Sequence, residues 1–201
     1  MEEGIIKQTV KDFSKTSEII QTLIIALLAL MVPTFLGKIL INLFGANSVI
    51  ANNSQIIVGS IVNTALVISA LNLKGWTKNL FVITMPSIST ILSGYVFKSA
   101  SIYMAYMIPA IWIGNFLLVY SFKYIMLKNK KNYLLTSIIG IILKVAVIFG
   151  FFIILKTIGI FPEKLVTNLQ KAMSLTQLIT AIIGCTIAFA VYKVEGKKDN
   201  I

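Results

Sequence analysis

The sequence predicts an all-α integral membrane protein, a bundle of six transmembrane helices with both termini in the cytoplasm. Of its 201 residues, 57% are hydrophobic and only 12% are charged, and the mean hydropathy is +0.90. A soluble domain usually has about twice this charged fraction. The charged residues also fall in short clusters between long apolar runs, which is typical of a chain that crosses a bilayer several times.

Six apolar segments have about 18 residues or more, the length that a helix needs to cross the hydrocarbon core. None shows the alternation expected of barrel strands, so helices are the expected spanning form. We expect one membrane domain over residues 1–201. It consists of an N-terminal segment (1–18), the helices 19–43, 56–73, 80–97, 102–124, 133–158 and 175–192, and a tail (193–201).

The first three segments are separated by polar connections. Segment 19–43 contains Pro33 and leads into the polar loop GANSVIANNSQ. Segment 56–73 follows and ends at NLKGWTKN. Segment 80–97 contains Pro86 near its middle. A proline removes a backbone donor and tends to bend its helix, and membrane proteins tolerate this where neighbouring helices or a cavity satisfy the freed carbonyl.

The last three segments are set apart by basic or amphipathic sequence. The short link KSAS precedes segment 102–124, which contains Pro109, and the basic loop KYIMLKNKKN precedes segment 133–158. Before segment 175–192, the stretch FPEKLVTNLQKAMS is long enough for a short interfacial helix. Its apolar residues recur at i, i+4 and i+8, as such a helix requires: Leu165, Leu169 and Met173.

The lysine distribution predicts the orientation. With the N-terminus inside, the inner regions hold twelve of the 18 lysines and the outer regions hold five, while Lys144 lies within a span. Because cytoplasmic loops carry the excess of basic residues, both termini are expected in the cytoplasm.

The composition also argues against several function classes. All basic residues are lysines at span ends and arginine is absent, so we expect no nucleic-acid binding. Histidine is absent and Cys185 is the single cysteine, so we expect no metal site and no cofactor. No paired intramembrane carboxylates and no glycine-rich phosphate loop occur, which predicts that the chain is not an enzyme and does not hydrolyse ATP.

Lys144 is the unusual feature, because a lysine at the centre of a spanning helix costs about 2.5–3.5 kcal/mol. Eleven or more residues of its segment lie on either side, too many for snorkelling to an interface. All seven acidic residues lie in tails or loops. Two explanations stay open: Lys144 faces a ligand, or burial and structural amides neutralise it.

Several polar side chains of other segments are expected at a similar depth. Asn63, Asn115 and Gln177 carry amides, which need partners because lipid offers none. For the two asparagines, hydrogen bonds between helices and contact with a ligand are both open.

Several stretches resemble, in this order, an uncharacterised branch of the substrate-binding S components of energy-coupling factor (ECF) transporters. They are IVGSIVNTALVISALNLKGW, PSISTILSG, YMIPAIWIGNFLLVYSF, IIGIILKVAVIF and MSLTQLITAIIGCTIA, and they cover most of residues 55–192. The resemblance implies a receptor in a prokaryotic plasma membrane that captures a vitamin-like micronutrient, anionic compounds included, from the outer side. It would dock on a transmembrane coupling subunit driven by two cytoplasmic ATPases.

The resemblance also implies a ligand site formed by the later helices in the outer half of the membrane. This points to Asn115, Lys144 and Gln177, with Trp112 as a stacking surface. S components often present an Ala-x-x-x-Ala face to the coupling subunit, which Ala26 and Ala29, three residues apart, match only in part. The alternatives are an ECF-independent transporter, channel or assembly subunit and, less favoured, a membrane enzyme with Lys144 as base or nucleophile.

Overall fold

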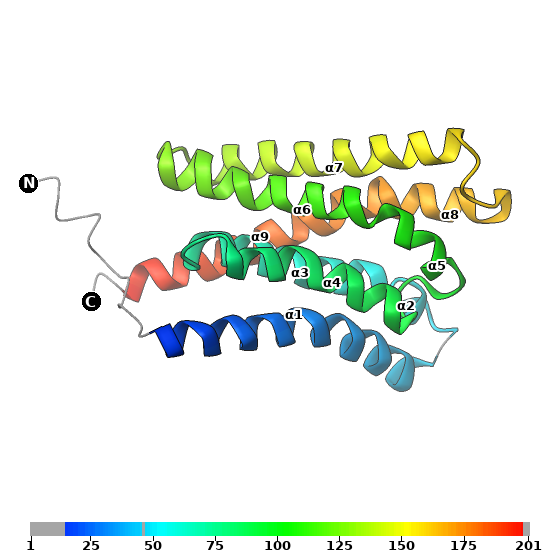
Figure 1. Cartoon of the computed structure of the whole chain (residues 1–201), viewed down its shortest axis with the longest axis horizontal. Coiled ribbons are helices and arrows are strands. Elements are labelled where there is room, and N and C mark those ends of the chain that lie inside the picture. The colour runs from blue at the N-terminus through cyan, green and yellow to red at the C-terminus, as the bar shows by residue number, and fades with distance from the viewer. Residues whose placement is uncertain (1–14, 46, 199–201) are drawn as a thin grey trace, which may run out of the picture.

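The computed structural model describes residues 15–45 and 47–198, and throughout these ranges the regular structure is helical, without a β-strand. The long helices lie side by side along the longest axis of the molecule (Figure 1). The predicted segments 1–18 and 193–201 fall partly outside the described residues. The prediction of an all-α fold is confirmed for the described part of the chain.

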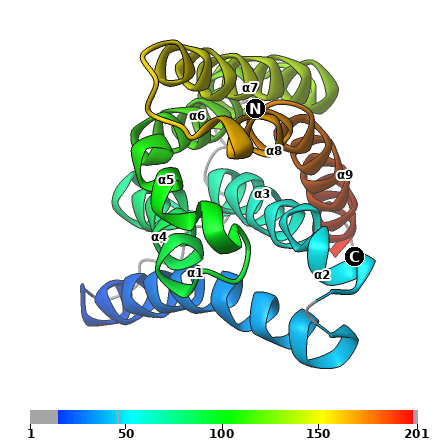
Figure 2. The same ribbon diagram turned by 90° about the vertical axis from the view of Figure 1, so that its right-hand side faces the viewer.

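Six helices of 14 to 30 residues make up the bundle, and short helices join them. The long helices are α1 (Lys15–Phe44), α3 (Ser54–Asn72), α4 (Thr77–Ser93), α6 (Ile108–Ser121), α7 (Tyr133–Thr157) and α9 (Leu175–Lys198). The short helices are α2 (Val49–Asn52), η1 (Lys98–Ala100), α5 (Ser101–Met104), η2 (Ala105–Met107), η3 (Phe122–Lys128) and α8 (Glu163–Met173). Viewed end-on, α3 lies at the centre, with α1 and α7 at opposite edges (Figure 2).

Five helical stretches in the described residues are long and apolar enough to cross a membrane. They are Ile19–Phe44, Ser54–Asn72, Ser101–Lys128, Tyr133–Thr157 and Glu163–Val194. The predicted segment 80–97 instead forms α4, which has 17 residues and rises about 25 Å, less than the hydrocarbon thickness of about 30 Å. The five helices indicate a multi-pass membrane protein.

Glycine and proline explain where the helices depart from the predicted segments. Gly94 ends α4 in the left-handed region, with φ of 69°, so residues 95–97 form a connection and not a last helical turn. Pro109 lies in the first turn of α6, where its missing N–H costs nothing. The predicted span 102–124 is therefore divided into α5, η2, α6 and a π-helical turn at η3.

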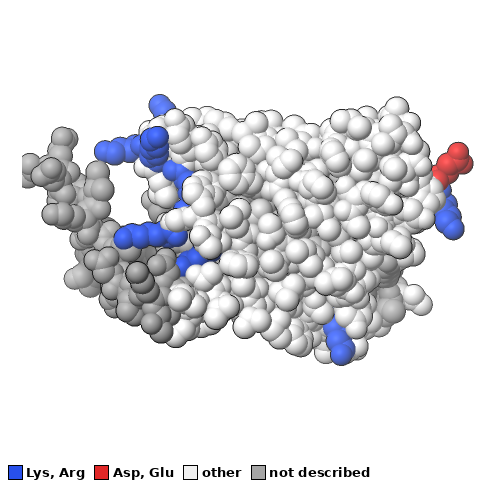
Figure 3. All heavy atoms as spheres, in the orientation of Figure 1, with Lys and Arg blue, Asp and Glu red and all other residues white. Residues whose placement is uncertain are grey.

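The outer surface fits a lipid environment. Large apolar side chains on α1 and α7, such as Leu23 and Ile142, are 58% and 60% exposed. Lysines gather at the end of the molecule where α1 begins and α9 ends (Figure 3), which we call the lysine-rich end. A row of neighbouring aromatic rings lies on its flank, as at a membrane interface: Trp76, Phe116, Tyr120 and Tyr124.

The buried apolar residues form two clusters, one toward each end of the bundle. The first includes Leu66, Leu118 and Phe122, and the second lies under α8 and includes Phe152 and Met173. On α7, Ile141 belongs to the first cluster and Ile148 to the second. Lys144 lies between these two isoleucines, at the boundary of the clusters.

Gly184 lets α9 approach α3 at the depth of this boundary. A Cβ atom at Gly184 would lie 2.4 Å from the Asn63 Cβ and 2.9 Å from the Thr64 backbone nitrogen. The Thr64 hydroxyl also lies 3.3 Å from the Gly184 carbonyl oxygen, to which it donates. The contact therefore fixes the position of the Asn63 side chain.

Gly184→Ala is expected to lower the free energy of unfolding by about 1–3 kcal/mol, because the added methyl overlaps the backbone and Cβ of α3. Gly150→Ala is the matched control: a Cβ there meets nothing within 4 Å, so stability should stay equal or rise by up to about 1 kcal/mol. Thermal unfolding of both variants in detergent measures the difference. Equal melting temperatures would contradict the close approach.

Candidate ligand-binding site around Lys144

Lys144 is 2% exposed and sits in the middle of α7. Its Nζ donates to the Oδ1 of Asn63 on α3 and, at 2.7 Å, to the Oδ1 of Asn115 on α6. An ammonium has three N–H donors, so two are used by these amides. No Asp or Glu occurs between residues 19 and 162, and the partners of this buried cation are therefore neutral oxygens.

Both asparagines are oriented by bonds on their nitrogen side. The Asn63 Nδ2 donates to the Thr180 hydroxyl on α9 at 3.2 Å, and the Asn115 Nδ2 donates to the Ile83 carbonyl on α4 at 3.1 Å. With both nitrogens engaged, each amide directs its oxygen toward Lys144. Lys144, its two amide partners and the groups that orient them thus come from five helices: α3, α4, α6, α7 and α9.

Gly114 brings α6 against α7 beside this centre. A Cβ at Gly114 would lie 3.1 Å from the Lys144 carbonyl oxygen and 2.9 Å from the Ile148 Cδ1. Because Asn115 is the next residue, this close approach places its amide within reach of the ammonium. Small residues at helix crossings commonly have this role in membrane proteins.

An inner cavity of about 70 Å³ adjoins the ammonium. This volume accommodates a few waters or a small polar group, and it is well below the 300–1,000 Å³ of a typical ligand site. Lys144 has one N–H donor that neither asparagine takes up, and it lines this cavity. The polar residues of the lining are Gln55, Asn63, Ser87, Thr90, Asn115, Lys144 and Gln177.

A larger entrance cavity of about 300 Å³ lies toward α8, at the end of the bundle opposite the lysine-rich end. It shares three lining residues with the inner cavity: Gln55, Val96 and Phe97. Its other lining residues include Asn168 and the exposed Lys171 of α8. The two cavities thus adjoin each other, with Lys171 in the lining of one and Lys144 in the lining of the other.

Four of the five predicted ligand-site residues line the inner cavity, and the fifth, Trp112, does not. Asn63, Asn115, Lys144 and Gln177 line the inner cavity, and the Gln177 Nε2 donates to the Ala172 carbonyl at 3.4 Å. Trp112, predicted as a stacking surface, lines neither cavity. Its indole N–H donates to the Ser87 hydroxyl at 2.8 Å, so it touches the site only through Ser87.

The predicted docking residues lie apart from this site. Ala26 and Ala29 are half-buried on α1, at the edge of the bundle. Ala29 lines a groove between α1, α3 and α4 and neither of the two cavities around Lys144.

Sequence reasoning missed Gln55, Val96 and Phe97, the residues between the two cavities. Gln55 is in the first turn of α3, and its Nε2 donates to the Ala172 carbonyl at 3.2 Å. Phe97 belongs to the connection after Gly94, which was expected as the end of a span. Gly94 is the residue from which this could have been predicted, because glycine commonly ends a helix. A helix that ends at Gly94 leaves Phe97 in the connection that follows.

No protein-family model matches the sequence, and comparisons with curated proteins and with solved structures found no match. In the described residues no three His, Cys, Asp or Glu side chains lie together as a metal site would require.

Proposed function

We propose that this protein is the substrate-binding S component of an ECF importer in a prokaryotic plasma membrane. It captures a vitamin-like, anionic or carbonyl-bearing micronutrient from the outer side. The observation that carries the proposal is the buried Lys144, which has no carboxylate partner and lines a cavity at the inner end of an entrance. A lysine so placed is a functional-site hypothesis by default in a membrane protein.

The ligand's acidic group or carbonyl enters the inner cavity and accepts the remaining N–H of Lys144. Charge-assisted bonds of this kind are stronger than neutral ones, particularly where water is excluded. Asn63 and Asn115 keep the ammonium in place, while Gln177 and Ser87 are within the same lining to fix the ligand's orientation. The rest of the ligand lies in the entrance cavity under α8.

In this proposal α4 is the sixth span, and both termini are cytoplasmic. The lysine-rich end faces the cytoplasm, in accord with the positive-inside rule, and α8 covers the site on the outer side. The 17 residues of α4 are short for a span, and the connection at residues 95–97 adds to its length. A transmembrane coupling subunit and two cytoplasmic ATPases supply the energy, because the sequence has no nucleotide-binding motif.

Purification of the full chain from its native membranes tests the proposal. The coupling subunit and both ATPases should co-purify, and mass spectrometry should find one small acidic or carbonyl compound retained at near one equivalent per chain. Uptake of that compound into liposomes should require the partners and ATP. Rapid uptake by the chain alone would contradict the proposal and favour an ECF-independent transporter.

A further inference from the structure

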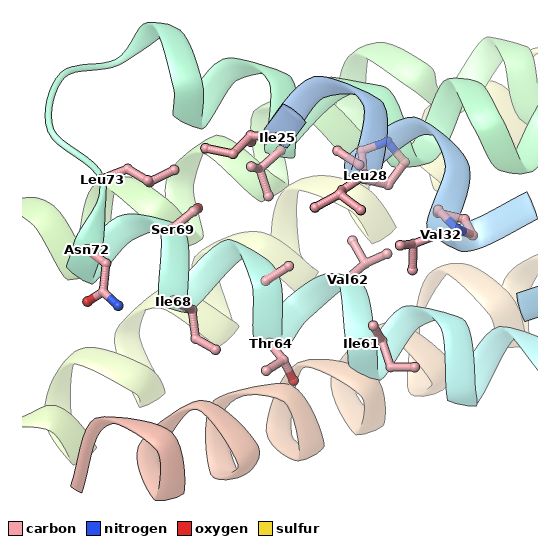
Figure 4. A pocket seen from close by; sticks show the side chains of 15 residues that line it. Ile25, Leu28, Val32, Ile61, Val62, Thr64, Ile68, Ser69, Asn72 and Leu73 are labelled. Carbon is pink, nitrogen blue, oxygen red and sulfur yellow. The ribbon is translucent and has the colours of Figure 1, made fainter. Parts of the chain in front are cut away.

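The groove between α1, α3 and α4 is a second feature, distinct from the Lys144 site. It has a volume of about 440 Å³, and its lining includes Ile25, Leu28 and Val32 of α1, Val62 of α3 and Leu73 directly after α3 (Figure 4). Along α3 the lining runs from residue 61 to residue 72, which is about 17 Å at 1.5 Å per residue. The groove therefore follows the helix axes and ends near the lysine-rich end.

The polar residues of the groove do not offer free hydrogen-bonding groups to an occupant. The Thr64 hydroxyl donates to the Ser60 carbonyl at 2.9 Å, and the Ser69 hydroxyl donates to the Leu66 carbonyl at 2.8 Å. Asn72, the third polar residue of the lining, also has an interaction partner. What faces the groove is thus almost entirely carbon. An apolar groove that follows the helix axes suits a linear hydrocarbon chain lying along it.

A more polar cavity of about 550 Å³ continues this groove at the lysine-rich end. Its lining follows directly in sequence, since Leu73 lines the groove and Lys74 lines this end cavity. Lys74 is exposed, whereas Lys78 is buried and donates to the Gln21 side-chain oxygen at 3.2 Å. Two cations thus lie where the headgroup would be if a linear acyl chain occupied the groove.

We propose that the groove between α1, α3 and α4 binds one acyl chain of an anionic glycerophospholipid, whose phosphate lies in the end cavity beside Lys74 and Lys78. The charge complementarity selects an anionic headgroup over a zwitterionic one, and the apolar lining selects an acyl chain. The lipid fills the space that α1, at the edge of the bundle, leaves open against α3 and α4. This inference does not depend on the proposed transport function.

Native mass spectrometry of the full chain tests the lipid site, after equilibration with mixed micelles of phosphatidylglycerol and phosphatidylcholine. We expect one phosphatidylglycerol to be retained in preference to phosphatidylcholine. Lys74→Gln should weaken this retention by about fivefold, since one lysine near an anionic headgroup is lost. Lys131→Gln, which removes an exposed lysine on the loop before α7, is the matched control and should leave retention unchanged.

A second pair of variants tests the groove itself. Ala65→Phe places a ring in the groove and should abolish retention of the lipid, whereas Ala146→Phe, on the exposed face of α7, should not. Equal retention of the two lipids, or equal loss in Lys74→Gln and Lys131→Gln, would overturn the proposal. The proposal would also be overturned if the chain forms a dimer, and if Ala65→Phe dissociates this dimer but leaves lipid retention unchanged. The groove would then bind a second copy of the chain.

Discussion

Lys144→Met is expected to weaken retention of the bound small molecule by about ten- to hundredfold and to leave the protein folded. The loss corresponds to one charge-assisted hydrogen bond, worth about 1.5–3 kcal/mol. The fold should survive because two effects oppose each other. Methionine removes the cost of burying an ammonium, which is several kcal/mol, while the oxygens of Asn63 and Asn115 lose their donor at about 1–3 kcal/mol each.

Two measurements on the purified variant check this expectation: the amount of small molecule released on denaturation, and the melting temperature in detergent. Lys156→Met is the matched control, since it makes the same change on the same helix at an exposed lysine that lines neither cavity. It should retain the molecule fully. Unchanged retention in Lys144→Met would refute the ligand-facing role, and an unfolded variant would show that the lysine is structural.

The membrane character of the chain follows from the sequence because it depends on composition and segment length, which are local properties. The boundaries were predicted less well where backbone geometry decides them. Residues 95–97 are apolar enough to continue a span, but the left-handed Gly94 ends α4 before them. In the same way Pro109 starts α6 inside a segment predicted to be one helix.

Lys144 could be identified from the sequence because a charge far from both ends of an apolar segment is visible without a structure. Its amide partners were identifiable only as a group of residues at similar depth. Which of them meet depends on close helix approaches, at Gly114 for Asn115 and at Gly184 for Asn63. Gln177 reaches the cavity lining but makes no bond to the lysine in the described structure.

The role expected for Trp112 came from the resemblance to S components, and the structure gives its ring another position. Trp112 lies three residues before Asn115, and three residues along a helix turn a side chain by about 60° from its neighbour. The ring therefore packs against the first apolar cluster, and only its N–H points to the site, through Ser87. A residue such as Phe97, 47 positions from Lys144 in sequence, reaches the cavity instead.

Asn115→Leu is expected to lower the free energy of unfolding by about 3–5 kcal/mol, because the ammonium loses one charge-assisted bond, worth about 1.5–3 kcal/mol, and the Ile83 carbonyl loses the Asn115 donor. Leucine has the branching of asparagine but a larger volume, and this packing change is common to both backgrounds of the comparison below. In the Lys144→Met background the same substitution should cost much less, because the ammonium that needs the Asn115 oxygen is gone. The lost bond from the Asn115 nitrogen to the Ile83 carbonyl is common to both backgrounds and cancels.

The four proteins of this double-mutant cycle, unfolded thermally or by denaturant in the same detergent, give the coupling between Lys144 and Asn115. We expect about 2–3 kcal/mol, the upper range for residues in one hydrogen-bond network. Additive effects within about 0.5 kcal/mol would contradict it, since the amide would then not solvate the cation. A large coupling, together with loss of ligand in Lys144→Met, would show that the same hydrogen-bond network stabilises the buried ammonium and holds it at the cavity.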